Sequence, residues 1–213
     1  HMAGMWMQTT STWIRWADSL TPDFFTIDVA NAIGRPAKSD DVRRFLDRHS
    51  ELSGAVAIPG IAGELQSSRA KLEAIAQNYL VAVQTAGEVY RQVARAKGRG
   101  LFITEVSMDE TDKPQTPVEL LVILAALADE RVPLQTVAPK FTGRFNKGVD
   151  YVGEVTQFER EFNDDLCVVR FAIRAYGLPD NLKLSLHSGS DKFSIYAPIH
   201  RAIRKHNADR KSV

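Results

Sequence analysis

Four predicted strands each place a polar or ionisable side chain near their carboxyl end, where it could bind a substrate or a metal ion. These residues are Asp28 on the first strand, Glu105 and Asp109 on the second, Lys140 after the third and His187 at the end of the fourth. Alternate side chains of a strand share one face, and parallel α/β folds build their sites at the carboxyl ends of the strands. Any one of these residues alone could be a turn cap, an ion-pair partner or a structural histidine. Their coincidence on four strands favours a site.

A short polar turn follows His187 before the next predicted helix. Gly189 permits a tight turn, and backbone N–H groups at a helix start form an anion site. A neutral imidazole suits a divalent metal, while Ser188, Ser190 and Lys192 could hold a carboxylate or hydroxyl groups. The alternative is an ordinary turn between strand and helix, in which a polar side chain only caps the helix.

The segment from Pro139 to Asp150 carries three cations, Lys140, Arg144 and Lys147, and one carboxylate. Its two glycines allow the backbone to approach a ligand closely. A loop this basic in a nearly neutral protein suits an anionic substrate such as a sugar acid. The alternative is a solvated surface loop.

The elements that would position these groups alternate along the chain. Short apolar or β-branched runs bounded by Gly, Pro, Asn or Asp predict strands; they lie at 24–29, 101–108, 134–138 and 182–187, with a doubtful fifth at 55–58. Apolar residues at helical spacing predict helices at 69–97, 116–127, 154–176 and 193–206. Thr116, Pro117 and Glu119 have the types and spacing of a helix start, and Gly98 and Gly177 are typical stop signals.

This alternation indicates an α/β fold with a parallel sheet and right-handed crossovers. We expect a partial (β/α) TIM-like barrel, since a complete one has eight such units and usually about 250 residues. Residues 19–207 would form this domain, with a tag and an unassigned segment at 1–18 and a tail at 208–213. No glycine-rich phosphate loop follows a strand, so we expect no nucleotide cofactor.

Composition narrows the function further. Of 213 residues, 44% are hydrophobic and 25% charged, and the net charge is +1 without a basic stripe, which argues against a nucleic-acid partner. No apolar run is long enough for a membrane span. The single Cys167 cannot form an internal disulfide and is expected to be a buried helix thiol in a cytoplasmic protein. The remaining histidines, in amphipathic helical stretches, are expected at the surface; they are His49, His200 and His206.

Three segments resemble the tagaturonate epimerase family. They are FITEVSMDETD at 102–112, the loop at 139–151 and LHSGSDKFSIY at 186–196, and the likeness extends from about residue 24 to residue 206. Runs of this length are far more specific than a short motif. The resemblance implies a barrel-like enzyme that interconverts tagaturonate and fructuronate with a divalent metal ion (Zn, Mn or Ni).

The two keto acids differ at a carbinol carbon one position beyond the carbon next to the ketone. Its hydrogen is not acidic, so enolisation cannot invert it, whereas a retro-aldol break, rotation of the aldehyde and re-addition can. The resemblance then implies these roles by position: His187, Asp109 and Asp150 at the metal; Glu105 as general acid/base, with Lys140 polarising the carbonyl; and Arg144 and Lys147 at the substrate. From their places at a strand end and in the turn after His187, we also expect Asp28, Ser188, Ser190 and Lys192 to bind the substrate.

Members of the family are longer than this chain, and the resemblance implies that an upstream segment supplies an Asp-His pair that is absent here. One histidine and a few carboxylates under-ligate a catalytic metal, which usually takes about three protein ligands. The alternatives of a remnant, an engineered fragment and a half-site completed by a second copy all stay open. A non-catalytic half-barrel module that dimerises through exposed sheet edges is the competing hypothesis, and a homo-oligomer is expected on either view.

Overall fold

A four-stranded parallel sheet lies at the centre of the molecule, in a computed structural model that describes residues 23–210. The strand order is β1-β4-β5-β6 and each neighbouring pair is parallel. The strands are β1 (Phe24–Asp28), β4 (Ile103–Ser107), β5 (Thr136–Ala138) and β6 (Lys183–Leu184). The four clear strands predicted from the sequence are therefore confirmed, although β6 ends sooner than the 182–187 run suggested.

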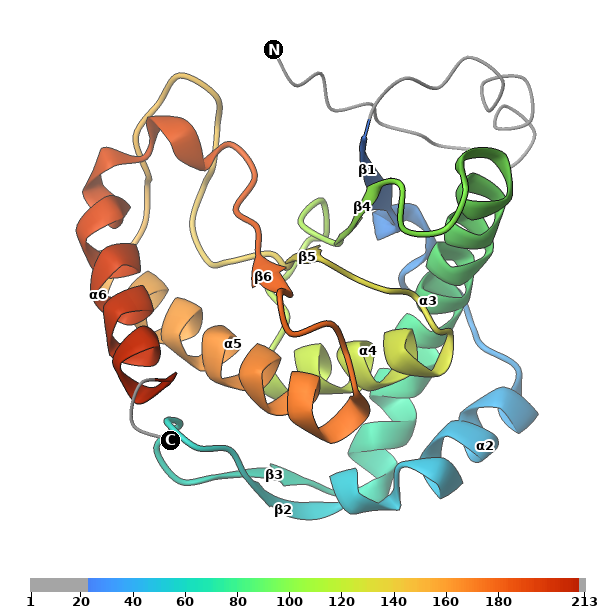
Figure 1. Ribbon diagram of the computed structural model, residues 1–213. Coiled ribbons are helices and arrows are strands. Elements are labelled where there is room, and N and C mark those ends of the chain that lie inside the picture. Colours follow the sequence, from blue (N-terminus) through green and yellow to red (C-terminus); the bar gives the residue numbers. More distant parts are fainter. Residues whose placement is uncertain (1–22, 211–213) are drawn as a thin grey trace.

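Helices join the strands and form an arc around one side of the sheet (Figure 1). They are α2 (Ser39–Arg48), α3 (Arg69–Lys97), α4 (Pro117–Asp129), α5 (Val155–Tyr176) and α6 (Phe193–Arg210). Single 3-10 turns occur at Ala30–Ala32 (η2), Ser50–Leu52 (η3) and Gly189–Asp191 (η4). The predicted start of α4 is confirmed, because Thr116 and Glu119 form a capping box and Pro117 occupies the first turn. Helix α6 continues through Arg210, into the segment expected as a tail.

The main core lies between the sheet and the helices. One row of strand residues, Ile27, Val106 and Val137, is in register and buried in the same apolar cluster as α3 and α4. The alternate row, Thr26, Glu105 and Thr136, points to the opposite face, as strand geometry requires. The sheet therefore has an apolar face toward the helices and a polar face toward the side where the candidate site lies.

The doubtful fifth strand belongs to a separate hairpin. Strand β2 (Gly54–Ala57) pairs antiparallel with β3 (Glu64–Ser67), which the sequence analysis did not predict. The parallel sheet thus has four strands within residues 23–210, with β1 and β6 at its edges. An α/β fold with a parallel sheet is confirmed. Residues 1–18, expected to be a tag and an unassigned segment, lie outside the described residues.

Two predicted surface histidines are buried. His49 and His206 are only 7% and 6% exposed, so their assignment to the surface was wrong. Helical periodicity alone could not show that these polar rings have hydrogen-bonding partners elsewhere in the fold. Cys167 is buried on α5, as predicted. Within the described part of the chain, no helix combines the length and apolar character that a membrane crossing requires.

Candidate functional site

His187 lies between two carboxylates at the carboxyl ends of the strands. Its Nε2 is 2.8 Å from Oε1 of Glu105, and its Nδ1 is 3.0 Å from Oδ2 of Asp109. Asp109 and Glu105 lie 78 and 82 positions before His187 in the chain. The predicted convergence of His187, Glu105 and Asp109 at one end of the sheet is therefore present in the structure.

Hydroxyl groups of the strands hold the two carboxylates in place. Thr26 on β1 donates to Oε1 of Glu105 at 2.9 Å, and the two residues are in register across the β1–β4 pair. Ser107, the last residue of β4, donates to Oδ1 of Asp109 at 2.6 Å. Glu105 is 2% exposed, and its second oxygen, Oε2, is buried without a hydrogen-bond partner. A buried, unpartnered carboxylate oxygen is costly unless a proton, a cation or a ligand approaches it.

The electrostatics of this cluster favour charged side chains. Burial alone would lower the pKa of His187, but the hydrogen bonds and negative charges of Asp109 and Glu105 raise it to about 10. Burial conversely would raise the pKa of each carboxyl; the His187 bonds, together with Ser107 at Asp109, hold both pKa values below their ordinary range. At neutral pH the cluster is thus an imidazolium between two carboxylates.

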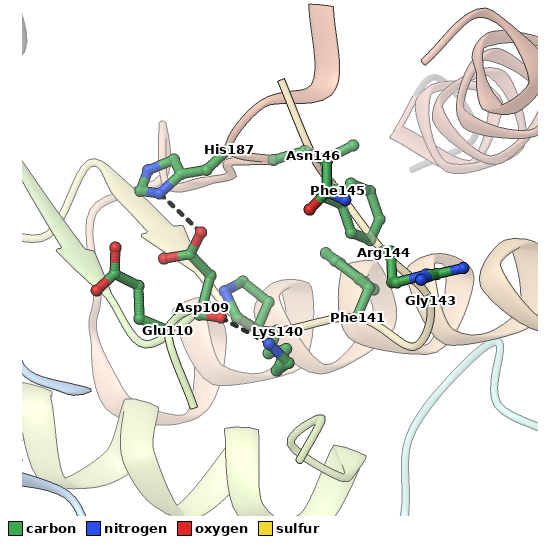
Figure 2. A pocket seen from close by; sticks show the side chains of 11 residues that line it. Asp109, Glu110, Lys140, Phe141, Gly143, Arg144, Phe145, Asn146 and His187 are labelled. Carbon is green, nitrogen blue, oxygen red and sulfur yellow. Dashed lines mark hydrogen bonds and ion pairs between the residues drawn. The ribbon is translucent and has the colours of Figure 1, made fainter. Parts of the chain in front are cut away.

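A pocket of about 320 Å³ opens beside His187, between the β4 and β5 ends and the basic loop. Figure 2 shows Asp109, Glu110 and Lys140 on one side and Arg144 on the other. The remaining lining residues are Pro139, Phe141, Gly143, Phe145, Asn146, Leu186 and His187. The Nζ of Lys140 donates to the backbone oxygen of Asp109 at 3.1 Å. Cations, carboxylates and an imidazole therefore meet in a cavity of a size suited to a small polar molecule.

The basic loop is anchored along its length, unlike a solvated surface loop. Glu161 on α5 accepts from the backbone N and the hydroxyl of Thr142 at 2.9 and 2.7 Å. The hydroxyl of Tyr151 donates to the Thr142 carbonyl at 2.9 Å, and its ring packs on Phe158 of α5. Gly143 has a φ of 99°, and a Cβ there would meet the Tyr151 ring at 2.5 Å, so glycine is required at this position.

Three other predicted site residues bond to the framework instead of lining the pocket. Lys192 is fully buried and its ammonium donates to the Asn146 carbonyl at 2.8 Å. Asp150 accepts from the backbone N and the hydroxyl of Ser194, in the first turn of α6. Asp28 accepts from the backbone N of Ala30 at 2.9 Å.

Lys147 is exposed and also lies outside the pocket. Ser188 has a left-handed backbone (φ 54°) and is likewise absent from the lining, while the side chain of Ser190 lies outside the described part of the structure. The metal and substrate roles assigned to these six residues stay predictions. Lys140, Arg144, Asp109 and His187, in contrast, all reach the pocket.

Sequence reasoning missed two residues that line the pocket, and it placed Glu105 closer to the substrate than the structure does. Glu110 and Asn146 line the cavity, yet neither stood out, because each is one of several polar residues in a loop. Glu105 does not line the cavity but lies behind His187. Strand parity correctly gave the face on which Glu105 lies; it carries no information on how far the side chain stands from the pocket wall.

The side chains around His187 have the chemistry of a site for a divalent cation. An imidazole and two carboxylates are suitable ligands, and the unpartnered oxygen of Glu105 is a further acceptor. In the arrangement seen for residues 23–210, however, no three His, Cys, Asp or Glu side chains surround a common point as a metal site would. The ligand atoms are of the right chemical types for a divalent metal, and binding of the metal would require His187 to lose its second ring proton.

Comparison with known proteins decides the family. A family model described as tagaturonate epimerase matches residues 36–209. This chain belongs to the tagaturonate epimerase family. Among curated proteins, the tagaturonate/fructuronate epimerase of Thermotoga maritima is 39% identical over 95 residues, which is 45% of this chain and 18% of that protein.

Solved structures of a tagaturonate epimerase show the same fold. The native fructuronate-tagaturonate epimerase of Cohnella laeviribosi has a TM-score of 0.71 and 26% identity, covering 93% of this chain and 41% of that one. The structure of the same enzyme complexed with two glycerol molecules has a TM-score of 0.73 and 26% identity, covering 96% of this chain and 42% of that one. The chain therefore spans well under half the length of the relatives that it matches.

Proposed function

We propose that this chain carries the substrate pocket of a tagaturonate/fructuronate epimerase, a sugar-acid isomerase that works with a divalent metal ion. The single observation that carries the proposal is the convergence of His187, Asp109, Lys140 and Arg144 on one pocket at the carboxyl ends of the strands. Membership of the family supports the substrate class. The proposal is for the activity of the whole family fold, of which this chain spans a part.

The two pocket cations would bind the anionic substrate. Arg144 is exposed and its guanidinium engages no other side chain among residues 23–210, so it is available to a substrate carboxylate. Lys140 is held by the Asp109 carbonyl, on the same side of the pocket as Asp109 (Figure 2). Its ammonium would polarise a ketone oxygen and so withdraw charge from the bond that breaks.

The carbon skeleton of the substrate favours a retro-aldol route. Removal of the proton from the β-hydroxyl lets the bond between the α and β carbons break, which leaves an aldehyde and an enediolate. The aldehyde rotates and the enediolate carbon adds to its other face; the same proton then returns to the new alkoxide. Atoms and electrons balance without an oxidant or reductant.

A carboxylate on the pocket wall is the best placed group for this proton. Glu110 lines the pocket and has no hydrogen bond or ion pair with another described residue. We therefore assign the proton transfer to Glu110 in place of Glu105, because Glu105 is separated from the pocket by His187. Glu105 would instead accept from His187 and fix the orientation of the ring.

A divalent cation, if bound, would be held by His187 and Asp109. It would supply Lewis-acid stabilisation of the negative charge that develops on the ketone-derived oxygen. Glu105, oriented by Thr26, would accept from the far nitrogen of the imidazole, an arrangement common behind metal-bound histidines. Self-association through the sheet edges also stays a proposal; β1 and β6 have no further strand partner within residues 23–210.

An isotope experiment tests the route. The chain is incubated with tagaturonate and Zn²⁺, Mn²⁺ or Ni²⁺ in D₂O, and the fructuronate formed is analysed by NMR and mass spectrometry. The retro-aldol route predicts that the inverted carbon keeps its original hydrogen. Deuterium at that carbon would show direct deprotonation and refute the route.

A further inference from the structure

Gln115 joins two loops that carry pocket residues but does not itself line the pocket. It precedes the N-cap of α4 and is 6% exposed. Its Oε1 accepts from the backbone N of Lys140 at 2.8 Å, and its Nε2 donates to Oγ1 of Thr111 at 3.0 Å. Thr111 in turn lies 3.1 Å from the carbonyl of Met108. One buried amide thus spans from the end of β4 to the end of β5.

These bonds continue the connection between the strands beyond the sheet. Among the described residues, the last backbone hydrogen bond between the two strands' ends runs from the N of Met108 to the carbonyl of Ala138, at 2.9 Å. The next residues on the two sides are Asp109 and Glu110 on one loop and Lys140 on the other, which are the groups that face the pocket. Their relative position therefore depends on side chains.

Among residues 23–210, one other side chain makes this connection directly. The Nζ of Lys140 donates to the Asp109 carbonyl at 3.1 Å, and that ammonium is also the group offered to a substrate. When the ammonium turns to a ligand, Gln115 still holds the backbone of Lys140. Since Gln115 uses both ends of its amide, it fixes the spacing of the two loops in either case.

Helix α4 does not need Gln115 for its own start. Thr116 accepts from the backbone N of Glu119, and Glu119 accepts from the backbone N of Thr116. The capping box therefore satisfies the helix end without the preceding residue. The buried amide of Gln115 bonds both pocket loops, and it also interacts with the hydroxyl of Tyr79 on α3.

We propose that Gln115 is a positioning residue, which sets the spacing of the Lys140 ammonium from the carboxylates of Asp109 and Glu110. This inference rests on the proposed function for its catalytic consequence. Misplacement of reacting groups by about 1 Å can cost on the order of 100-fold in rate. Loss of Gln115 should therefore reduce kcat more than it changes KM, since Arg144 would still bind the substrate.

Two variants separate positioning from a general loss of stability. Gln115→Met keeps the length of the side chain and removes both hydrogen bonds. Gln115→Glu keeps an acceptor for Lys140 N, and its other oxygen accepts from the Thr111 hydroxyl once that hydroxyl turns from the backbone carbonyls of Met108 and Lys113, so a bond between the two loops is retained. Gln84→Met is the matched control, because Gln84 is a partly buried glutamine that bonds Asp41 at 3.4 Å between α2 and α3.

The test measures kcat and KM for tagaturonate together with amide hydrogen exchange. In Gln115→Met, kcat should fall by roughly 10- to 100-fold with KM within about threefold. Gln115→Glu should recover kcat to within about threefold of the unchanged chain. Amide hydrogen exchange should accelerate at Lys140 and at residues 109–112 in Gln115→Met, but not in Gln115→Glu or Gln84→Met. A kcat for Gln115→Met within about twofold of the unchanged chain, or equal to that of Gln84→Met, would overturn the inference.

The exchange measurement separates failure of this inference from failure of the proposed function. If the unchanged chain gives no turnover of tagaturonate, the proposed function fails. The connection by Gln115 is then judged on exchange: faster exchange at Lys140 and at 109–112 in Gln115→Met supports it, and unchanged exchange there overturns it.

Discussion

Two histidines in this molecule each contact a pair of carboxylates, at opposite ends of the sheet. His187 lies between Glu105 and Asp109 at the carboxyl ends of the strands. His49, after α2, has Nδ1 3.1 Å from Glu51 and Nε2 3.0 Å from Asp129 at the end of α4. Because the helices run back along the sheet, the end of α4 lies toward the amino ends of the strands.

The surroundings of the two histidines differ in the features that bind ligands. The ring of His49 packs against Phe45 and Tyr176, and Asp129 also pairs with Arg48 at 2.6 Å. A nearby pocket of about 290 Å³ has arginines in its wall, but His49 does not line it.

At the other end, His187 itself lines the pocket, where Arg144 engages no other side chain of the described part. Contact with two carboxylates is therefore not a sufficient sign of a site. Direct access of the histidine to a cavity whose wall carries an unpaired arginine, Arg144, distinguishes the two regions within residues 23–210.

Metal binding should separate the two histidines most strongly. His187→Gln is expected to weaken the binding of Zn²⁺, Mn²⁺ or Ni²⁺ by about 100-fold or more, because the variant loses the only imidazole in the pocket wall. His49→Gln should bind as the unchanged chain does. Calorimetric titration with each metal checks this, and equal affinities of the two variants would contradict our comparison.

The next largest difference is expected between Arg144, in the wall of the His187 pocket, and Arg44, in the wall of the pocket near His49. Arg144→Ala is expected to raise KM for tagaturonate roughly tenfold with a smaller change in kcat, since it removes a charge-assisted contact to the carboxylate. Arg44→Ala is the control, because Arg44 lies in the wall of the other pocket and already pairs with Asp41. Steady-state kinetics measure both; an unchanged KM in Arg144→Ala would refute the substrate role of the loop.

The pH dependence of stability should reveal the charge of His187. Its pKa is raised from 6.5 to about 10 in the folded chain, so its charge stabilises the fold fully below about pH 6.5. That contribution is lost as the pH rises through about 10. The stability difference between the unchanged chain and His187→Gln, measured by urea unfolding without metal, should therefore shrink from pH 6.5 to pH 10. A constant difference over this range would show that His187 is not held as an imidazolium.

The smallest expected effect comes from Asp165, a buried carboxyl outside the His187 pocket whose pKa is also perturbed. It tests whether a perturbed pKa by itself marks a site. Burial, with the charges of Glu161 and Asp164, raises the pKa of Asp165 well above its ordinary range. A raised carboxyl pKa makes the fold less stable as the pH rises above 3.8, so Asp165→Asn should raise Tm at neutral pH by roughly 2–4 °C. The gain should fade toward acid pH, and Asp180→Asn, at an exposed position, serves as the control. A lower Tm at neutral pH in Asp165→Asn would contradict this.

The sequence was most informative where local chemistry decides structure. The start of α4 followed from Thr116, Pro117 and Glu119, because a capping box is satisfied within four residues. Strand parity correctly placed Glu105, Asp109 and His187 near one another, because a period of two fixes the face on which a side chain lies.

Long-range packing accounts for what the sequence could not reveal. The charges of Lys192 and Asp150 looked available to a ligand; in the fold one is fully buried on the Asn146 carbonyl and the other bonds Ser194. The strand expected at 55–58 corresponds to β2 at 54–57, yet its antiparallel pairing with 64–67 did not follow from the sequence, because residues 64–67 carry no clear strand pattern. His49 is buried by partners up to 80 residues away in the chain.

Direct assay of the purified chain with tagaturonate tests the central claim. With a divalent metal present, we expect fructuronate to accumulate to an equilibrium mixture, and the same mixture to form from fructuronate. His187→Gln should abolish the conversion and His49→Gln should leave it within about threefold. Undiminished conversion by His187→Gln, or no conversion by the unchanged chain with any of the three metals, would contradict the assignment of the reaction to this pocket.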